Sequence, residues 1–147
     1  MTPAEILARA HERAVERKLP YAGALLPEEA WQLMQSGARL VDVRTRAEWD
    51  WVGRVPNAVE IEWNSWPQGE PNPNFVAELS EQVPKGSPVL FLCRSGARSH
   101  NAAVAATKAG YAQSYNILQG FEGDKDAAGH RNTVGGWRVA GLPWIQG

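Results

Sequence analysis

Short apolar segments alternate with helix-like segments along the chain, and this alternation constrains the fold more than any other feature of the sequence. The apolar segments are bounded by turn-forming residues and are short, which is typical of buried strands. Strands are predicted at residues 38–43, 59–61, 88–92 and 114–117, and helices at residues 3–18, 27–35, 75–82 and 99–109. Strands that alternate with helices predict the α/β class with a mainly parallel sheet.

Chemically active side chains follow two of the predicted strands. Asp42 and Arg44 stand where one strand ends, and Cys93 stands where another ends. In open α/β sheets the functional crevice lies at the carboxyl ends of the strands. We therefore expect these three residues at one edge of the sheet.

The composition narrows the classes of protein to consider. The chain has 147 residues, a formal net charge of -1 and one cysteine. This length suits one domain, and a lone cysteine excludes an internal disulfide and a multi-cysteine metal cluster. A near-neutral charge disfavours a nucleic-acid binder, and no apolar run is long enough to span a membrane. Without the apolar core of a secretory signal, the chain is expected to be cytoplasmic, with a free thiol.

The charge is unevenly distributed along the chain. Residues 1–81 hold thirteen acidic and eight basic residues, whereas residues 82–147 hold three acidic and seven basic residues. No acidic residue lies between Glu81 and Glu122, and that stretch contains Cys93. Such surroundings stabilise a thiolate and attract a small anion, although the same pattern is compatible with chance clustering on a solvated face.

Residues 93–99 read Cys-Arg-Ser-Gly-Ala-Arg-Ser and join a predicted strand to a predicted helix. A loop of small residues can turn its N–H groups inward, and with a helix N-terminus these groups form an anion-binding cradle. Two arginines can bind an oxyanion through paired hydrogen bonds. The alternative is an inert cysteine buried at a strand end, which leaves the two arginines unexplained. We therefore interpret Cys93 as a nucleophile.

Three segments of the chain resemble signatures of the rhodanese-like sulfurtransferase superfamily, in the order in which that family has them. The first is Leu-Val-Asp-Val-Arg at 40–44, with Glu-Trp at 48–49 and Gly-Arg-Val-Pro-Asn-Ala at 53–58. The second is the cysteine loop at 93–99. The third is Gly-Trp at 136–137 with Ala-Gly-Leu-Pro at 140–143.

The resemblance implies a three-layer α/β/α domain over residues 23–147 around a mainly parallel five-stranded sheet, preceded by a helical extension over residues 1–22. It implies that Cys93 takes a sulfane sulfur from thiosulfate or a persulfide donor, becomes a persulfide, and passes the sulfur to cyanide, a thiol or a protein acceptor. No metal or organic cofactor is implied. The implied substrate-binding residues are Arg94, Ser95, Gly96, Ala97, Arg98 and Ser99, with Asp42 and Arg44 in support.

Within that list the two arginines have different expected roles. Arg94 is expected to bind the anionic donor, and Arg98 to brace the loop and raise its positive field. Four residues separate Cys93 from Arg98. The related cell-cycle phosphatases and arsenate reductases have five at this place, so the shorter loop favours sulfur chemistry over phosphate hydrolysis.

A second class of function stays open at this point. The chain can be a non-catalytic sulfur carrier or interaction module, with the acidic half and the helix at 3–18 as its docking surface. That helix has a narrow apolar side and is expected to dock weakly. Of the seven tryptophans, Trp63 and Trp66 are the candidates for an exposed wall of the pocket or a patch for a partner. An insertion at 122–134, which contains Asp124, Asp126, His130 and Arg131, is expected to be a solvated turn with local ion pairs rather than a lid, an acceptor-docking loop or a metal site.

Overall fold

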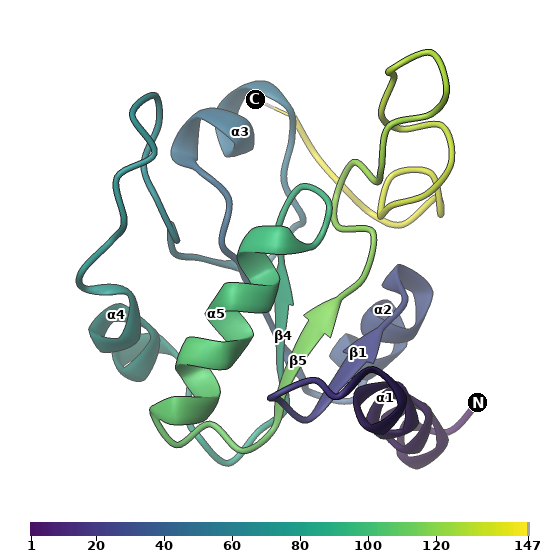
Figure 1. Ribbon diagram of the computed structural model, residues 1–147, viewed down its shortest axis with the longest axis vertical. Helices are drawn as coiled ribbons and strands as arrows, with labels where there is room; N and C mark the ends of the chain where they lie inside the picture. The colour runs from purple at the N-terminus through teal and green to yellow at the C-terminus, as the bar shows by residue number, and fades with distance from the viewer. Residues whose placement is uncertain (147) are drawn as a thin grey trace.

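Five short parallel strands form one sheet in the order β1-β5-β4-β2-β3 in the computed structural model, which describes residues 1–146 (Figure 1). The strands are β1 (Gly23–Leu25), β2 (Arg39–Asp42), β3 (Val59–Glu60), β4 (Val89–Leu92) and β5 (Ser114–Ile117). The helices are α1 (Pro3–Arg17), α2 (Pro27–Gln35), α3 (Arg46–Trp51), α4 (Phe75–Gln82) and α5 (Ala97–Lys108). The predicted α/β class and five-stranded parallel sheet are confirmed.

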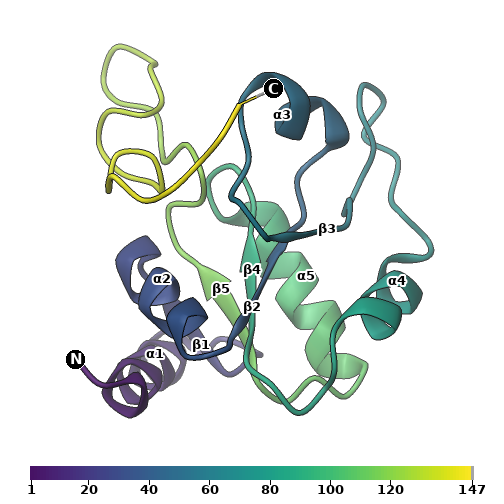
Figure 2. The same ribbon diagram turned by 180° about the vertical axis from the view of Figure 1, so that it is seen from behind.

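Helices cover both faces of the sheet, with α1 and α2 on one face and α4 and α5 on the other (Figures 1 and 2). Strand β4 shows why, because all four of its residues are apolar and buried. Leu90 and Leu92 pack in the core beneath α1 and α2, while Val89 and Phe91 pack in the core beneath α4 and α5. Strands buried on both faces read as continuous apolar runs, and this is the pattern seen at residues 88–92.

Helix α1 packs more closely against the sheet than its narrow apolar side predicts. Ile6 and Ala10 are fully buried, and Arg13 forms an ion pair of 2.6 Å with Glu29 of α2. A Cβ atom at Gly23 would lie 2.6 Å from the carbonyl carbon of Ala10, so glycine at this strand position permits the contact. The expectation of weak docking was wrong, because small residues on α1 allow the backbones to approach.

The strand pattern missed β1, whose three residues pair only with the distant strand β5. Helix α5 also begins two residues earlier than expected, at Ala97, so the cysteine loop runs directly into it. Within residues 1–146 no helix is long and apolar enough to cross a membrane.

The chain beyond β5 contains no further helix or strand up to residue 146, and it runs along the carboxyl edge of the sheet (Figure 1). Trp137 anchors this segment, since its side chain is fully buried in the core that α1 and α2 cover. Its backbone N–H donates to the carbonyl of Gly120 at 2.8 Å. The segment is therefore held against the edge where the candidate site lies.

Candidate active site

The strand ends bring Cys93 and the Asp42–Arg44 pair to the same edge of the sheet, as expected. Asp42 pairs in register with Leu92, the residue before the cysteine. The Cys93 side chain is only 1% exposed, so its sulfur lies beneath the loop rather than on the surface.

Two groups contact the sulfur directly. The backbone N–H of Gly96 donates to Cys93 Sγ at 3.1 Å, and the hydroxyl of Ser99 lies 3.3 Å from it. Gly96 has a φ of 117°, a left-handed conformation that L side chains rarely adopt and that turns this N–H inward. Because Gly96 also caps α5, the sulfur faces the N-terminus of a twelve-residue helix whose first N–H groups have no intrahelical acceptor. This arrangement stabilises negative charge at the sulfur.

A buried hydrogen-bond network extends inward from Ser99. Its hydroxyl donates to Asn116 Oδ1 at 2.6 Å, and Asn116 Nδ2 donates to the Gly96 carbonyl at 3.3 Å and to the Tyr21 hydroxyl at 3.4 Å. Tyr21 in turn lies 2.7 Å from Nδ1 of His100. Sequence reasoning missed Asn116 and Tyr21. The available signal was an amide side chain inside a strand that is otherwise buried, which has to find partners.

The carbonyl groups of the cysteine loop are held by the chain that follows β5. The N–H of Phe121 donates to the Cys93 carbonyl at 2.8 Å, and the N–H of Glu122 donates to the Arg94 carbonyl at 3.0 Å. In a trans peptide the C=O and the next N–H point in opposite directions. Holding these two carbonyls outward therefore turns the N–H groups of Arg94 and Ser95 toward the inside of the loop.

Arg98 is braced by Glu48, a partner that the sequence did not identify. The guanidinium donates to both carboxylate oxygens, at 2.7 and 3.0 Å. Burial by itself would raise the pKa of Glu48, but hydrogen bonds from Arg98 and Thr45 and the charge of Arg98 lower this pKa to about 2. The pair supports the expected bracing role of Arg98, whereas Glu48 offsets much of the positive field that the sequence led us to expect from it.

Arg94 differs from Arg98 in its surroundings. Its side chain is exposed and makes no ion pair or hydrogen bond within residues 1–146. It lines a cleft of about 510 Å³ between α3, the loop at 64–69 and the cysteine loop. Trp51 and Trp66 line the same cleft and are 71% and 62% exposed. A cationic group beside two exposed indoles can bind an anion that carries an organic part.

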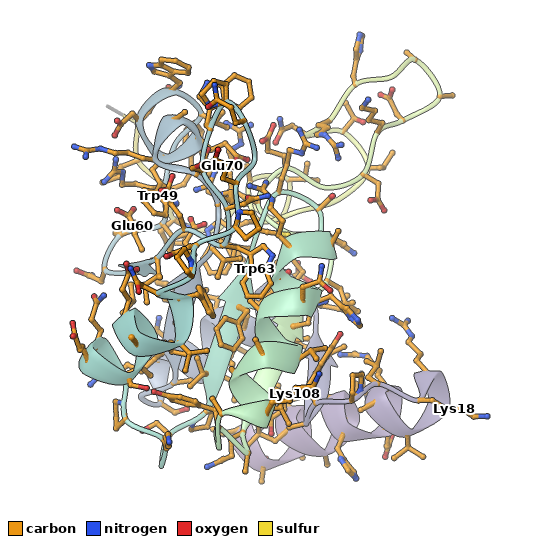
Figure 3. All side chains as sticks on the ribbon, turned by 60° about the vertical axis from the view of Figure 1, so that its left-hand side comes forward. Lys18, Trp49, Glu60, Trp63, Glu70 and Lys108 are labelled. Atoms are coloured by element: carbon orange, nitrogen blue, oxygen red, sulfur yellow. The ribbon has the colours of Figure 1, made fainter. Side chains whose placement is uncertain are left out.

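Trp63 was expected to form an exposed wall of the pocket, and this expectation was wrong. Trp63 packs edge-on against Phe75 at a ring-centroid distance of 5.0 Å, on the side of the core beneath α4 and α5 (Figure 3). Trp51, at the end of α3, takes the place expected for Trp63.

Asp42 and Arg44 form a closed pair inside the protein. Both side chains are fully buried: Nε and Nη2 of Arg44 donate to the Asp42 carboxylate, at 2.7 Å in the shortest contact, and Nη2 also donates to the carbonyl of Gly53. The Arg44 guanidinium also stacks 4.2 Å above the ring of Phe121. These contacts tie β2 to the segment that backs the cysteine loop, which suits a supporting role.

The insertion at 122–134 is organised by hydrogen bonds. Asp126 accepts from the N–H groups of Ala128 and His130 and from the hydroxyl of Thr133. The expected local ion pairs are absent within residues 122–134: Arg131 donates to the carbonyl of Gly123, and Glu122 pairs at 3.9 Å with Arg138 outside the insertion. Within residues 1–146 no group of three acidic, histidine or cysteine side chains is placed to hold a metal ion.

Comparisons with known proteins agree with this geometry. The Rhodanese-like domain family matches residues 26–127. The crystal structure of Rv0390 from M. tuberculosis superimposes with a TM-score of 0.79 and 48% sequence identity, over 86% of this chain and 99% of that chain. An uncharacterized protein of Rickettsia conorii is 37% identical over 115 residues, which are 76% of this chain and 86% of that protein. The thiosulfate sulfurtransferase GlpE of Haemophilus influenzae is 28% identical over 102 residues, which are 67% of this chain and 84% of that protein.

Proposed function

This chain belongs to the rhodanese-like domain family, and we propose that it is a sulfurtransferase that carries sulfur on Cys93 as a persulfide. The observation that carries the proposal is the N–H of Gly96, which lies 3.1 Å from the Cys93 sulfur at the start of α5. Preorganised donors of this kind stabilise the anionic sulfur before and after transfer. The 28% identity to a thiosulfate sulfurtransferase supports thiosulfate as the donor to test first.

The first half-reaction loads the cysteine. The Cys93 thiolate attacks the outer sulfur of thiosulfate, a new S–S bond forms, and the S–S bond of thiosulfate breaks so that sulfite leaves with the electron pair. The product is a Cys93 persulfide whose outer sulfur carries the negative charge. Inward-facing N–H groups of Arg94 to Ser99 form the cradle for that sulfur, and the exposed Arg94 side chain binds the anionic donor in the cleft.

The second half-reaction unloads it. Cyanide or a thiolate attacks the outer sulfur, and the bond between the two sulfurs breaks to regenerate the Cys93 thiolate. Because Cys93 is the only cysteine among the 147 residues, no second thiol of this chain can resolve the persulfide. The acceptor therefore comes from outside the chain, and a two-step covalent route of this kind gives ping-pong kinetics.

Mass spectrometry and turnover together test the proposal. After thiosulfate treatment, the intact protein is expected to gain one sulfur atom, located on Cys93, and to lose it again when cyanide is added with release of thiocyanate. Cys93→Ala is expected to remove both the added mass and the turnover. Absence of the added sulfur on wild-type protein, with every donor tried, would refute the proposal. Loading without turnover would instead support the carrier role.

A further inference from the structure

The Cys93 sulfur and the Asn116 side chain share one hydroxyl group, that of Ser99. The hydroxyl oxygen lies 3.3 Å from Cys93 Sγ and 2.6 Å from Asn116 Oδ1, and all three side chains are buried. A serine hydroxyl has a single proton to donate and lone pairs with which to accept. The direction of that proton decides whether the sulfur faces a donor or an acceptor.

The Gly96 carbonyl determines which way the Asn116 amide is turned. It lies 3.3 Å from Asn116 Nδ2, and because a carbonyl can only accept, the amide has to present its N–H group there and its oxygen to Ser99. An amide oxygen cannot donate, so Ser99 gives its only proton to Asn116. The other Nδ2 proton goes to the Tyr21 hydroxyl, which leaves the Tyr21 proton for Nδ1 of His100.

We propose that Asn116 is a positioning residue that withholds the Ser99 proton from the Cys93 sulfur. A thiol S–H can donate to the Ser99 oxygen, but a thiolate gains no donor from Ser99 while the Ser99–Asn116 bond persists. The side-chain sulfur then has the Gly96 N–H as its donor within residues 1–146. The proposal rests on Cys93 as the nucleophile of the proposed function and adds a group that adjusts its reactivity.

This arrangement acts on the resting thiolate and spares the persulfide. In the persulfide the negative charge is on the outer sulfur, and Sγ is bonded to two atoms and uncharged, so it needs no donor from Ser99. A thiolate with one fewer hydrogen bond is a stronger nucleophile, because nucleophilicity falls as the basicity of a thiol falls. Asn116 therefore favours transfer of sulfur onto Cys93.

Other titratable groups reach the sulfur from the surrounding elements. Arg98 of α5 interacts with it by charge and is paired with Glu48 of α3. The closed Asp42–Arg44 pair follows β2 at the same sheet edge. The exposed Arg94 follows Cys93, and Tyr21 and His100 connect to the sulfur through Asn116. The variants below leave all of these residues in place.

The test is the pH profile of Cys93 alkylation by iodoacetamide in wild type, Asn116→Ala, Ser99→Ala and the double variant. In Asn116→Ala the Ser99 proton is free to turn to the thiolate, and the midpoint is expected to fall by about one pH unit, the size expected for a hydrogen bond to a charged group. Ser99→Ala is expected not to raise the midpoint. In the double variant the effect of Asn116→Ala is expected to disappear.

Ser114→Ala is the matched control. Ser114 is buried like Ser99 and donates to the carbonyl of Tyr111 at 2.8 Å, away from the cysteine. This variant is expected to leave the alkylation profile unchanged. Asn116→Leu, which keeps the four side-chain heavy atoms of asparagine and their branching at Cγ, repeats the test if Asn116→Ala does not fold, and Ser99→Ala alone decides the case if neither folds.

A raised midpoint in Ser99→Ala would overturn the proposal, because it would mean that Ser99 donates to the thiolate. An unchanged midpoint in a folded Asn116 variant would overturn it as well. Alkylation needs no sulfur donor, so these outcomes are independent of turnover. A failure of the proposed function would appear separately, as the absence of sulfur on Cys93 after treatment with thiosulfate and the other donors.

Discussion

The two sides of Cys93 are built in different ways. On the inner side, Ser99 and Asn116 are buried and connected by a bond of 2.6 Å, and backbone N–H groups of Phe121 and Glu122 fix the loop carbonyls. On the outer side, Arg94 and Trp66 are exposed at the rim of a cleft, and Arg94 has no side-chain partner within residues 1–146. The inner side fixes the state of the sulfur, and the outer side is free to meet a substrate.

This difference separates two kinds of effect. A change on the inner side should alter stability and the reactivity of Cys93 toward every reagent, because buried bonds are lost or strained. A change on the outer side should alter the binding of particular substrates and leave the fold intact. The following predictions test that separation, beginning with the largest expected effect.

Gly120→Ala is expected to cause the largest loss. Gly120 has a φ of 64°, and a Cβ atom there would lie 2.5 Å from the carbonyl groups of Cys93 and Arg94. The added methyl group would push the cysteine loop out of place, and we expect a loss of about 2–4 kcal/mol in the free energy of unfolding from overpacking and backbone strain. Urea unfolding measures the loss of stability, and the rate of Cys93 alkylation measures the displacement of the cysteine loop.

Gly129→Ala is the control for backbone strain alone. Gly129 has a φ of 81° and no atom within 4 Å of the added Cβ, so about 1 kcal/mol of strain is expected without any change at Cys93. Equal losses in the two variants would show that contact with the loop carbonyls does not matter. That result would contradict the conclusion that the segment after β5 holds the cysteine loop in place.

Glu48→Gln tests the ion pair between Glu48 and Arg98, which lies between the two sides. The pKa of Glu48 is about 2 in the folded protein, below its ordinary value of 4.5. A lowered folded-state pKa stabilises the fold above the ordinary pKa, and this contribution is lost as the pH falls from about 4.5 toward about 2. We expect Glu48→Gln to cost about 1–3 kcal/mol at pH 7, with a difference that shrinks across this window.

Urea unfolding at a series of pH values measures this difference. Glu81→Gln is the matched control, because Glu81 is exposed and near the end of α4, and it should lose almost no stability at any pH. A constant difference between wild type and Glu48→Gln from pH 7 to pH 2 would contradict the assignment of the lowered pKa to folding.

The sequence predicts the cysteine loop better than the distant contacts that hold it. The cysteine loop is contiguous, so its residues and the following helix are visible in one stretch of sequence. Contacts that are local in sequence also form elsewhere: Thr45 precedes α3 and forms a capping box with Glu48, three residues away. By contrast, the bond between Ser99 and Asn116 joins two elements that are seventeen residues apart, and the contact between Arg98 and Glu48 spans fifty residues.

Strand β1 was missed for the same physical reason. Gly23, Ala24 and Leu25 have no alternation and no strong strand propensity, and their extended conformation comes from pairing with Tyr115, Asn116 and Ile117. The same strand pairing places β5, and with it Asn116, beside the cysteine loop. Contacts of this kind depend on the strand order, which a single sequence does not contain.

Arg94→Ala is the prediction that tests the outer side. Because Arg94 is exposed and unpaired within residues 1–146, its loss should leave the melting temperature unchanged. Loss of a charge-assisted hydrogen bond should raise the KM for thiosulfate by about tenfold or more. Arg39→Ala is the control, since Arg39 is also exposed but begins β2 at the opposite edge of the sheet. A large fall in melting temperature with an unchanged KM would show that Arg94 stabilises the fold and does not bind the donor.

Added salt should raise the KM of wild type more than that of Arg94→Ala, because it screens the attraction that Arg94 supplies.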